Sequence, residues 1–169
     1  DDQIAKIEAV SHEGILQGIR SFSALFNNNV GLAVTVDNHC PVIKLNPLKI
    51  LDYPRFLYRG FLIDSAHHYK DIPFLKRLIF NMGMMKLNTL HWHMTDHQQF
   101  GIHVPGEYTS RLASNQPQNT YYNVSEVQRM IDFGIKFGIN VLIEIDIPGH
   151  ALSWEKGYKN IVNVHCKNE

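Results

Sequence analysis

Three short apolar segments, separated by two stretches with helical periodicity, constrain the fold of this chain more than any other feature. The segments cover residues 61–63, 87–93 and 140–145. Between them, apolar side chains recur at helical spacing over 73–86 and 125–137. Strands that alternate with helices are typical of parallel βαβ units, and continuous apolar strands indicate burial on both faces. The sequence therefore predicts an α/β fold around a parallel sheet.

Both predicted helices carry boundary signals. Pro73 suits the first turn of the first helix, because the N–H that proline lacks has no helical partner there. Ser125 and Gln128 resemble a capping box at the start of the second helix, and Gly138 ends it. The apolar face expected for the first helix comprises Phe74, Leu78, Met82 and Met85.

The residues before the first apolar segment follow a different pattern. Residues 4–10 alternate between polar and apolar and predict a short strand. Ser11 is the expected start of a helix that ends at the asparagines 27–29. A second strand is expected over 32–36, and the prolines within 38–57 favour an extended linker.

Polar side chains follow each predicted strand, over 64–69, 96–99 and 146–150. In a (β/α)₈ barrel these positions lie at the C-terminal mouth, where active sites are built. Glu144 and Asp146 alternate onto one face of the third strand. Burial of two carboxylates is unfavourable unless each meets a donor or a cation. These clusters indicate an enzyme-like site at one end of the sheet.

Histidines are concentrated in the same places. His91 and His93 share one face of their strand, with Trp92 on the other face. They fit a polar network under a substrate, a metal site, or buried structural histidines, and the pattern leaves these open. His150 follows a Pro-Gly turn, and an imidazole beside a carboxylate can orient and tune a general acid.

Composition excludes several classes of protein. Sixteen basic and sixteen acidic side chains balance, so neither nucleic acid nor an anionic membrane is an expected partner. No apolar run approaches the ~20 residues that span a bilayer. The start of the chain lacks signal-peptide character, so we expect a cytosolic protein, a processed one or an internal fragment.

Two further features concern the cellular setting. Cys40 and Cys166 fit one disulfide, two free thiols or bridges to other chains. Asn123, Val124 and Ser125 match the N-glycosylation sequon, which makes Asn123 a candidate glycosylation site. Together these features favour a secreted or lysosomal protein.

Five motifs in register resemble the family 20 glycoside hydrolases, the β-N-acetylhexosaminidases, which include lysosomal enzymes. The motifs are RGFLID at 59–64, HY at 68–69, KLN at 86–88, HWHMTDHQ at 91–98 and EIDIPGHALSW at 144–154. The resemblance implies the first three βα units of a (β/α)₈ TIM barrel over 54–169. It also implies that residues 1–53 are the end of a small α/β domain and a linker.

The resemblance further implies retaining hydrolysis of terminal β-linked N-acetylglucosamine or N-acetylgalactosamine, with the substrate's acetamido oxygen as nucleophile. Arg59 would bind the sugar's 3- and 4-hydroxyls. Asp96 and His150 would be the catalytic relay that supports a glutamate acid, with His93, Asp146 and Glu144 as supporting groups. The resemblance implies no cofactor and no metal. The partners would be a glycan substrate and the remainder of the barrel, in a possible homo- or heterodimer.

The chain departs from the family pattern in three respects. It contains no Asp-Glu dipeptide, the catalytic pair of the family, so we expect this chain alone to be inactive. His67 stands where an arginine is usual, and His97 where an acidic residue is usual. Two alternatives stay open, a non-catalytic carbohydrate-binding or structural relative and a metal-dependent amidohydrolase barrel.

Overall fold

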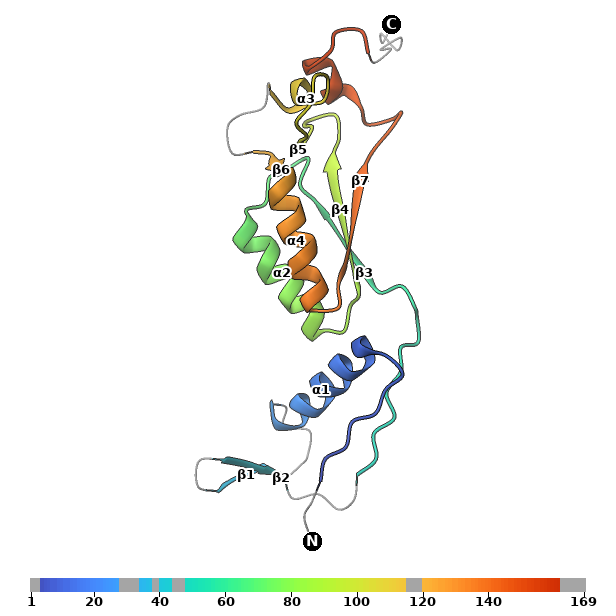
Figure 1. Ribbon diagram of the computed structural model, residues 1–169, viewed down its shortest axis with the longest axis vertical. Helices are drawn as coiled ribbons and strands as arrows, with labels where there is room; N and C mark the ends of the chain where they lie inside the picture. Colours follow the sequence, from blue (N-terminus) through green and yellow to red (C-terminus); the bar gives the residue numbers. More distant parts are fainter. Residues whose placement is uncertain (1–3, 28–33, 38–39, 44–47, 115–119, 162–169) are drawn as a thin grey trace, which may run out of the picture. The chain divides into compact units, whose positions relative to one another are not determined.

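The computed structural model describes residues 4–27, 34–37, 40–43, 48–114 and 120–161 (Figure 1). The chain divides into two compact units, Asp1–Leu57 and Tyr58–Glu169. Within these ranges, no helix is both long enough and apolar enough to cross a membrane. Cys166 and the Cys40 side chain lie outside the described part of the chain, and the predicted alternatives for their disulfide bonding lie outside it too.

The first unit contains one helix and a two-stranded hairpin. Helix α1, His12–Asn27, begins after Ser11, whose Oγ accepts a 3.1 Å hydrogen bond from the Gly14 N–H, as expected of a helix cap. Strands β1, Val34–Asp37, and β2, Cys40–Ile43, pair antiparallel. β2 falls inside the predicted linker, where the prediction was wrong. Pro41 suggested the linker, but within the described residues β2 pairs with β1 alone, and such an edge strand tolerates proline.

Residues 4–10 do not form the predicted strand. Ile7 and Ala9 instead pack on α1, where two glycines let them approach closely. A Cβ at Gly18 would lie 2.5 Å from Ile7 Cγ2, and one at Gly14 would lie 2.8 Å from Ala9 Cβ. The alternation of polar and apolar residues over 4–10 therefore reflects packing on a helix rather than pairing with a neighbouring strand.

The second unit is built on a three-stranded parallel sheet, as predicted. The strands are β3, Gly60–Asp64, β4, Thr89–Thr95, and β7, Asn140–Ile145, in the order β3-β4-β7. Each strand connects to the next through a helix, α2, Ile72–Met84, and then α4, Val124–Lys136. Both helices lie on one face of the sheet (Figure 1).

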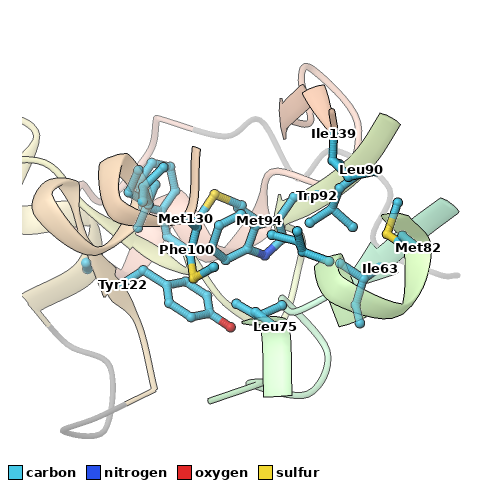
Figure 2. Packing of buried hydrophobic residues seen from close by; sticks show 14 of the residues in the cluster. Ile63, Leu75, Met82, Leu90, Trp92, Met94, Phe100, Tyr122, Met130 and Ile139 are labelled. Carbon is cyan, nitrogen blue, oxygen red and sulfur yellow. The ribbon is translucent and has the colours of Figure 1, made fainter. Parts of the chain in front are cut away.

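β4 separates the core from the opposite face by simple alternation. Leu90, Trp92 and Met94 are fully buried and meet Leu75 from α2 and Met130 from α4 (Figure 2). The strand register places the intervening side chains on the other face in two layers. These layers consist of Leu62, His91 and Leu142, and of Asp64, His93 and Glu144.

Only the central strand is buried on both faces. In β3 and β7, Leu62 is 52% exposed and Leu142 is 46% exposed, both on the face away from the helices. The prediction of burial on both faces therefore holds for β4. Within the described residues it is wrong for β3 and β7, which are each exposed on one face.

The buried face of α2 is rotated from the predicted one. Leu75, Ile79 and Met82 are buried, whereas Phe74 and Met85 are exposed. The helix carries apolar residues on more than one side, so periodicity alone did not fix the face. Asp71 caps the helix, accepting a 2.7 Å hydrogen bond from the Phe74 N–H, and Pro73 lies in the first turn as predicted.

The predicted loop 101–122 contains short elements. Strands β5, Ile102–His103, and β6, Tyr122–Asn123, pair parallel. Helix α3, Ser110–Ser114, and the 3₁₀ helix η1, Leu152–Lys156, complete the unit. The capping box of α4 is formed by Asn123 and Glu126 rather than by Ser125 and Gln128. Gly138, with φ of 66°, ends α4 as predicted.

Candidate active site

Asp96 is the centre of a hydrogen-bonded cluster at the carboxyl ends of the parallel strands. It directly follows β4 and is 4% exposed. Its Oδ1 accepts a 2.5 Å hydrogen bond from the His97 N–H and lies 3.0 Å from His150 Nδ1. Its Oδ2 lies 3.1 Å from His93 Nε2. The predicted contact between Asp96 and His150 is therefore confirmed.

These contacts keep the Asp96 carboxyl ionised. Burial opposes ionisation, but the His97 N–H, His150 and His93 outweigh it and lower the pKa of Asp96 from 3.8 to about 2. A buried carboxylate surrounded by donors has a fixed orientation, because each oxygen is held from a different direction. Asp96 is thus suited to fix the orientation and tautomer of a neighbouring imidazole.

Glu144, on β7, extends the cluster across the sheet. Its Oε1 lies 2.8 Å from His93 Nδ1, and its Oε2 is in close contact with His91 Nε2. A continuous chain of side chains therefore runs His91–Glu144–His93–Asp96–His150. This arrangement follows from the register, since His93 pairs with Glu144 on the face away from the core.

Asp64, at the end of β3, brings a third carboxylate to the same edge. Its Oδ1 accepts hydrogen bonds from the N–H groups of Ala66, at 2.8 Å, and His67, at 3.0 Å. The His67 Nδ1 lies 2.5 Å from Asp64 Oδ2 and 3.9 Å from Asp96 Oδ2. Burial again opposes ionisation, but these hydrogen bonds lower the pKa of Asp64 below its ordinary value.

His150 is held in an unusual backbone conformation. Its φ is 56°, in the left-handed region that non-glycine residues seldom occupy. Its ring stacks on His97, with centroids 5.0 Å apart and an interplanar angle of 23°. The Leu152 N–H donates to His97 Nδ1 at 3.3 Å, so His97 is itself fixed by η1. The His150 side chain is 58% exposed.

His67 and His97 belong to the cluster, although neither was among the predicted site residues. Both are exposed side chains on loops after strands, where no periodic pattern singles out a residue. The available signal was their place in the polar stretches 64–69 and 96–99.

Asp146 lies beside the cluster, as predicted. Its backbone N–H donates to Thr95 Oγ1 at 3.0 Å, which ties the loop after β7 to the end of β4. One oxygen of its carboxylate falls within 4.8 Å of ligand atoms of His93 and Glu144.

Two groups of three side chains have the composition of a metal site, His93 with Glu144 and Asp146, and His97 with Asp96 and His150. In the first group both imidazole nitrogens of His93 already contact carboxylates. In the second group the two imidazole rings are stacked, so their in-plane lone pairs do not converge on one point. The geometry favours proton-sharing over metal coordination in both groups.

Arg59 is the predicted sugar-binding residue, and the structure does not bring it to the cluster. It precedes the amino end of β3, and its Nε donates to the Lys86 carbonyl at 2.8 Å. Its backbone N–H donates to Asn88 Oδ1 at 2.9 Å. The cluster lies at the opposite, carboxyl end of the parallel strands. The position of Arg59 supports a structural link between β3 and β4 rather than contact with a sugar.

Residues 56–169 match the family described as glycosyl hydrolase family 20, catalytic domain. The chain belongs to glycosyl hydrolase family 20. The resemblance inferred from the five motifs is thereby confirmed, and family 20 membership implies a TIM-barrel-type catalytic domain for the second unit.

The relatives of this family 20 chain agree. It is 40% identical over 154 residues to beta-hexosaminidase 3 of Arabidopsis thaliana, a match that covers 91% of this chain and 28% of that protein. It is 32% identical over 165 residues to beta-hexosaminidase subunit beta of Homo sapiens, covering 95% and 27%. The chain thus spans less than a third of these relatives.

Solved structures show the same relationship. A family 20 β-N-acetylglucosaminidase superposes with a TM-score of 0.70 at 25% identity, covering 88% of this chain and 30% of that one. An exo β-N-acetylglucosaminidase from Vibrio harveyi, in complex with N-acetylglucosamine, superposes with a TM-score of 0.63 at 26% identity, covering 85% and 24%.

Proposed function

We propose that this chain is part of an exo-acting glycosidase that releases terminal β-linked N-acetylglucosamine or N-acetylgalactosamine. The reaction is substrate-assisted and retaining, with the acetamido oxygen of the substrate as nucleophile. The contact of Asp96 Oδ1 with His150 Nδ1, at 3.0 Å, is the observation that carries this proposal. An ionised carboxylate on one ring nitrogen leaves the other nitrogen of His150 to support a general acid at the mouth.

The residues of the cluster then have distinct roles. Asp96 orients His150, and His150 supports the glutamate of an Asp-Glu pair, which this sequence does not contain. His93, Glu144 and Asp146 hold Asp96 and the strand ends in place. The Asp-Glu pair would come from the remainder of the barrel.

In this proposal β3, β4 and β7 are the first three strands of the (β/α)₈ barrel, and residues 1–53 are the end of a small α/β domain and a linker. The parallel order β3-β4-β7 supports it, because consecutive barrel strands are neighbours. The exposed apolar side chains Leu62 and Leu142 on the face away from the helices also support it, since they would fill a barrel interior.

The setting of the enzyme follows from its relatives. Several are named as subunits of beta-hexosaminidase, which supports a homo- or heterodimer. We propose a glycan substrate, no cofactor, and a lysosomal or secreted location, where hexosamine-containing glycans are degraded.

The test uses the full-length protein that carries this chain, with chromogenic β-N-acetylglucosaminides and β-N-acetylgalactosaminides. Release of sugar with retained anomeric configuration, and slower hydrolysis when the acetamido oxygen is made less nucleophilic, is the expected result. Binding of the sugar without turnover would identify a non-catalytic relative instead. Stoichiometric zinc with activity lost on chelation would identify a metal-dependent hydrolase.

A further inference from the structure

His93 lies between two carboxylates and is nearly out of contact with solvent. Its Nδ1 is 2.8 Å from Glu144 Oε1, its Nε2 is 3.1 Å from Asp96 Oδ2, and the residue is 8% exposed. The carboxylates come from opposite directions, one from β7 and one from the loop after β4.

The hydrogen-bonding chemistry of this position is restrictive. A neutral imidazole has one N–H donor and one acceptor nitrogen, whereas an ionised carboxylate only accepts. Both contacts are hydrogen bonds at once only when both ring nitrogens carry a proton. The alternative requires a proton on one of the carboxyls, which would leave His93 with a single N–H.

The charges around His93 favour the doubly protonated form. The titratable groups that face it come from the three strands and the loops that follow them: Asp64, His67, His91, Asp96, Glu144 and Asp146. Four of these six groups are carboxylic acids. An imidazolium at the centre offsets their mutual repulsion.

We propose that His93 is a buried imidazolium that positions Asp96 and Glu144 and sets the charge of the site. As a positioning residue it acts through Asp96. By donating to Oδ2, it directs Oδ1 toward His150 and keeps the carboxyl ionised. His91 contacts the other oxygen of Glu144. The carboxylates of Glu144 and Asp96 therefore contact three imidazoles, those of His91, His93 and His150.

The balance of effects on His93 itself agrees with this geometry. Burial alone would lower the pKa of His93, but the hydrogen bonds to Asp96 and Glu144 outweigh burial and raise the pKa above its ordinary value of 6.5. The surroundings of His93 therefore stabilise its charged form despite its burial.

The direct test is nuclear magnetic resonance of the full-length protein labelled with ¹⁵N-histidine. The His93 signal is assigned as the one lost in His93→Gln. At pH 6.5, most His93 side chains should carry protons on both nitrogens, and the titration midpoint should lie above pH 6.5. A single N–H at pH 6.5, or a midpoint at or below that pH, would overturn the proposal. The variant serves only to assign the signal, and the titration is measured on the wild-type protein, with or without turnover.

Isosteric variants identify the source of the effect. Glu144→Gln should move the midpoint down by about one pH unit or more, the size expected when an opposite charge within 4–6 Å is removed. Asp132→Asn on α4, whose carboxylate bonds Gln128 instead, is the matched control and should leave the midpoint unchanged. An unchanged midpoint in Glu144→Gln would contradict the role of Glu144.

The consequence for catalysis rests on the proposed function. His93→Gln removes one of the donors that keep Asp96 ionised, so the acid limb of kcat/KM should move to higher pH. A uniform loss of kcat/KM with an unmoved pH profile would show a packing role only. The resonance experiment separates the two proposals, because it reports the charge on His93 even in a protein that hydrolyses no glycoside.

Discussion

His150 Nδ1 lies 3.0 Å from Asp96 Oδ1, although the two residues are 54 positions apart in the chain. The loops after β4 and β7 carry them, and these strands are neighbours in the sheet. If the two act as one unit, removing either should cost about as much as removing both. We expect Asp96→Asn and His150→Ala each to reduce kcat in the full-length enzyme, and the double variant to lose much less than their product. Independent, multiplicative losses would argue against the relay.

The free energy of unfolding should be greatest between about pH 4 and pH 6.5. Because Asp96 has a pKa lowered from 3.8 to about 2, its contribution of about 2 kcal/mol is present above pH 4 and is lost as pH falls toward 2. Because His93 has a raised pKa, its contribution is complete below pH 6.5 and is lost as pH rises through the folded-state value. Urea unfolding at a series of pH values measures both limbs. In Asp96→Asn, the fall in the free energy of unfolding toward low pH should become shallower. An unchanged fall would show that other carboxyls cause it.

Arg59→Ala tests whether this residue is structural. Its Nε joins the amino end of β3 to the Lys86 carbonyl, and loss of a hydrogen bond from a charged donor costs roughly 1.5–3 kcal/mol. We expect a loss of stability of this order. Any fall in kcat/KM should be equal for substrates with and without the sugar's 3- and 4-hydroxyls. A larger fall for the hydroxylated substrate would restore the sugar-binding role predicted from the sequence.

Asn123 combines a predicted glycosylation site with a structural cap. Its Oδ1 accepts from the Glu126 N–H at 2.8 Å and from Ser125 Oγ at 2.6 Å, so a glycan on Nδ2 leaves the cap oxygen in place. In a eukaryotic secretory host, we expect a mass shift that a glycan-removing amidase reverses. Asn123→Ala should lose both the glycan and about 1 kcal/mol of stability.

Ser125→Ala and Asn123→Asp are the matched controls for this site. Both remove the sequon, and both retain an oxygen acceptor at position 123 for the first turn of α4. They should lose the glycan while keeping most of the helix stability. Secreted protein with an unmodified Asn123 would dismiss the glycosylation site and leave only the cap.

The 169-residue chain by itself should not hydrolyse β-N-acetylglucosaminides. Its sequence has no Asp-Glu pair, and a positioned general acid contributes roughly 10²–10⁴-fold to the rate. Release of a chromophore by the purified chain, above that of a His150→Ala control, would show that another carboxylate serves as the acid.

The sequence predicted well what short-range periodicity determines. A period of two placed Trp92 in the core and His91 with His93 on the other face, and the structure confirms it. The third strand was predicted at the residues it occupies, 140–145, because its apolar run is bounded by Gly138 and by a polar turn.

The features that the sequence pattern left undetermined have a common physical cause. The buried face of α2, the pairing of β2 and the position of Arg59 depend on contacts between segments distant in the sequence. Arg59 is five residues from Asp64, the end of β3 that carries the cluster, and the strand direction places it at the opposite, amino end. His67 and His97 were noted only as departures from a pattern, since an exposed loop residue gains a role only when the fold supplies its partners.

β4 is hydrogen-bonded to a strand on each side, and Leu90, Trp92, Met94 and Thr95 are completely buried. Trp92 Nε1 also donates to Ser65 Oγ at 2.9 Å, and Ser65 Oγ donates to the His93 carbonyl at 3.2 Å. Segments of this kind open least often, so the amide hydrogens of β4 should be among the slowest in the unit to exchange with deuterium. Asp96 comes directly after this strand. The carboxylate at the centre of the cluster is therefore attached to the strand expected to open least often, and through its 3.0 Å contact with His150 Nδ1 it extends that order to a side chain that is 58% exposed.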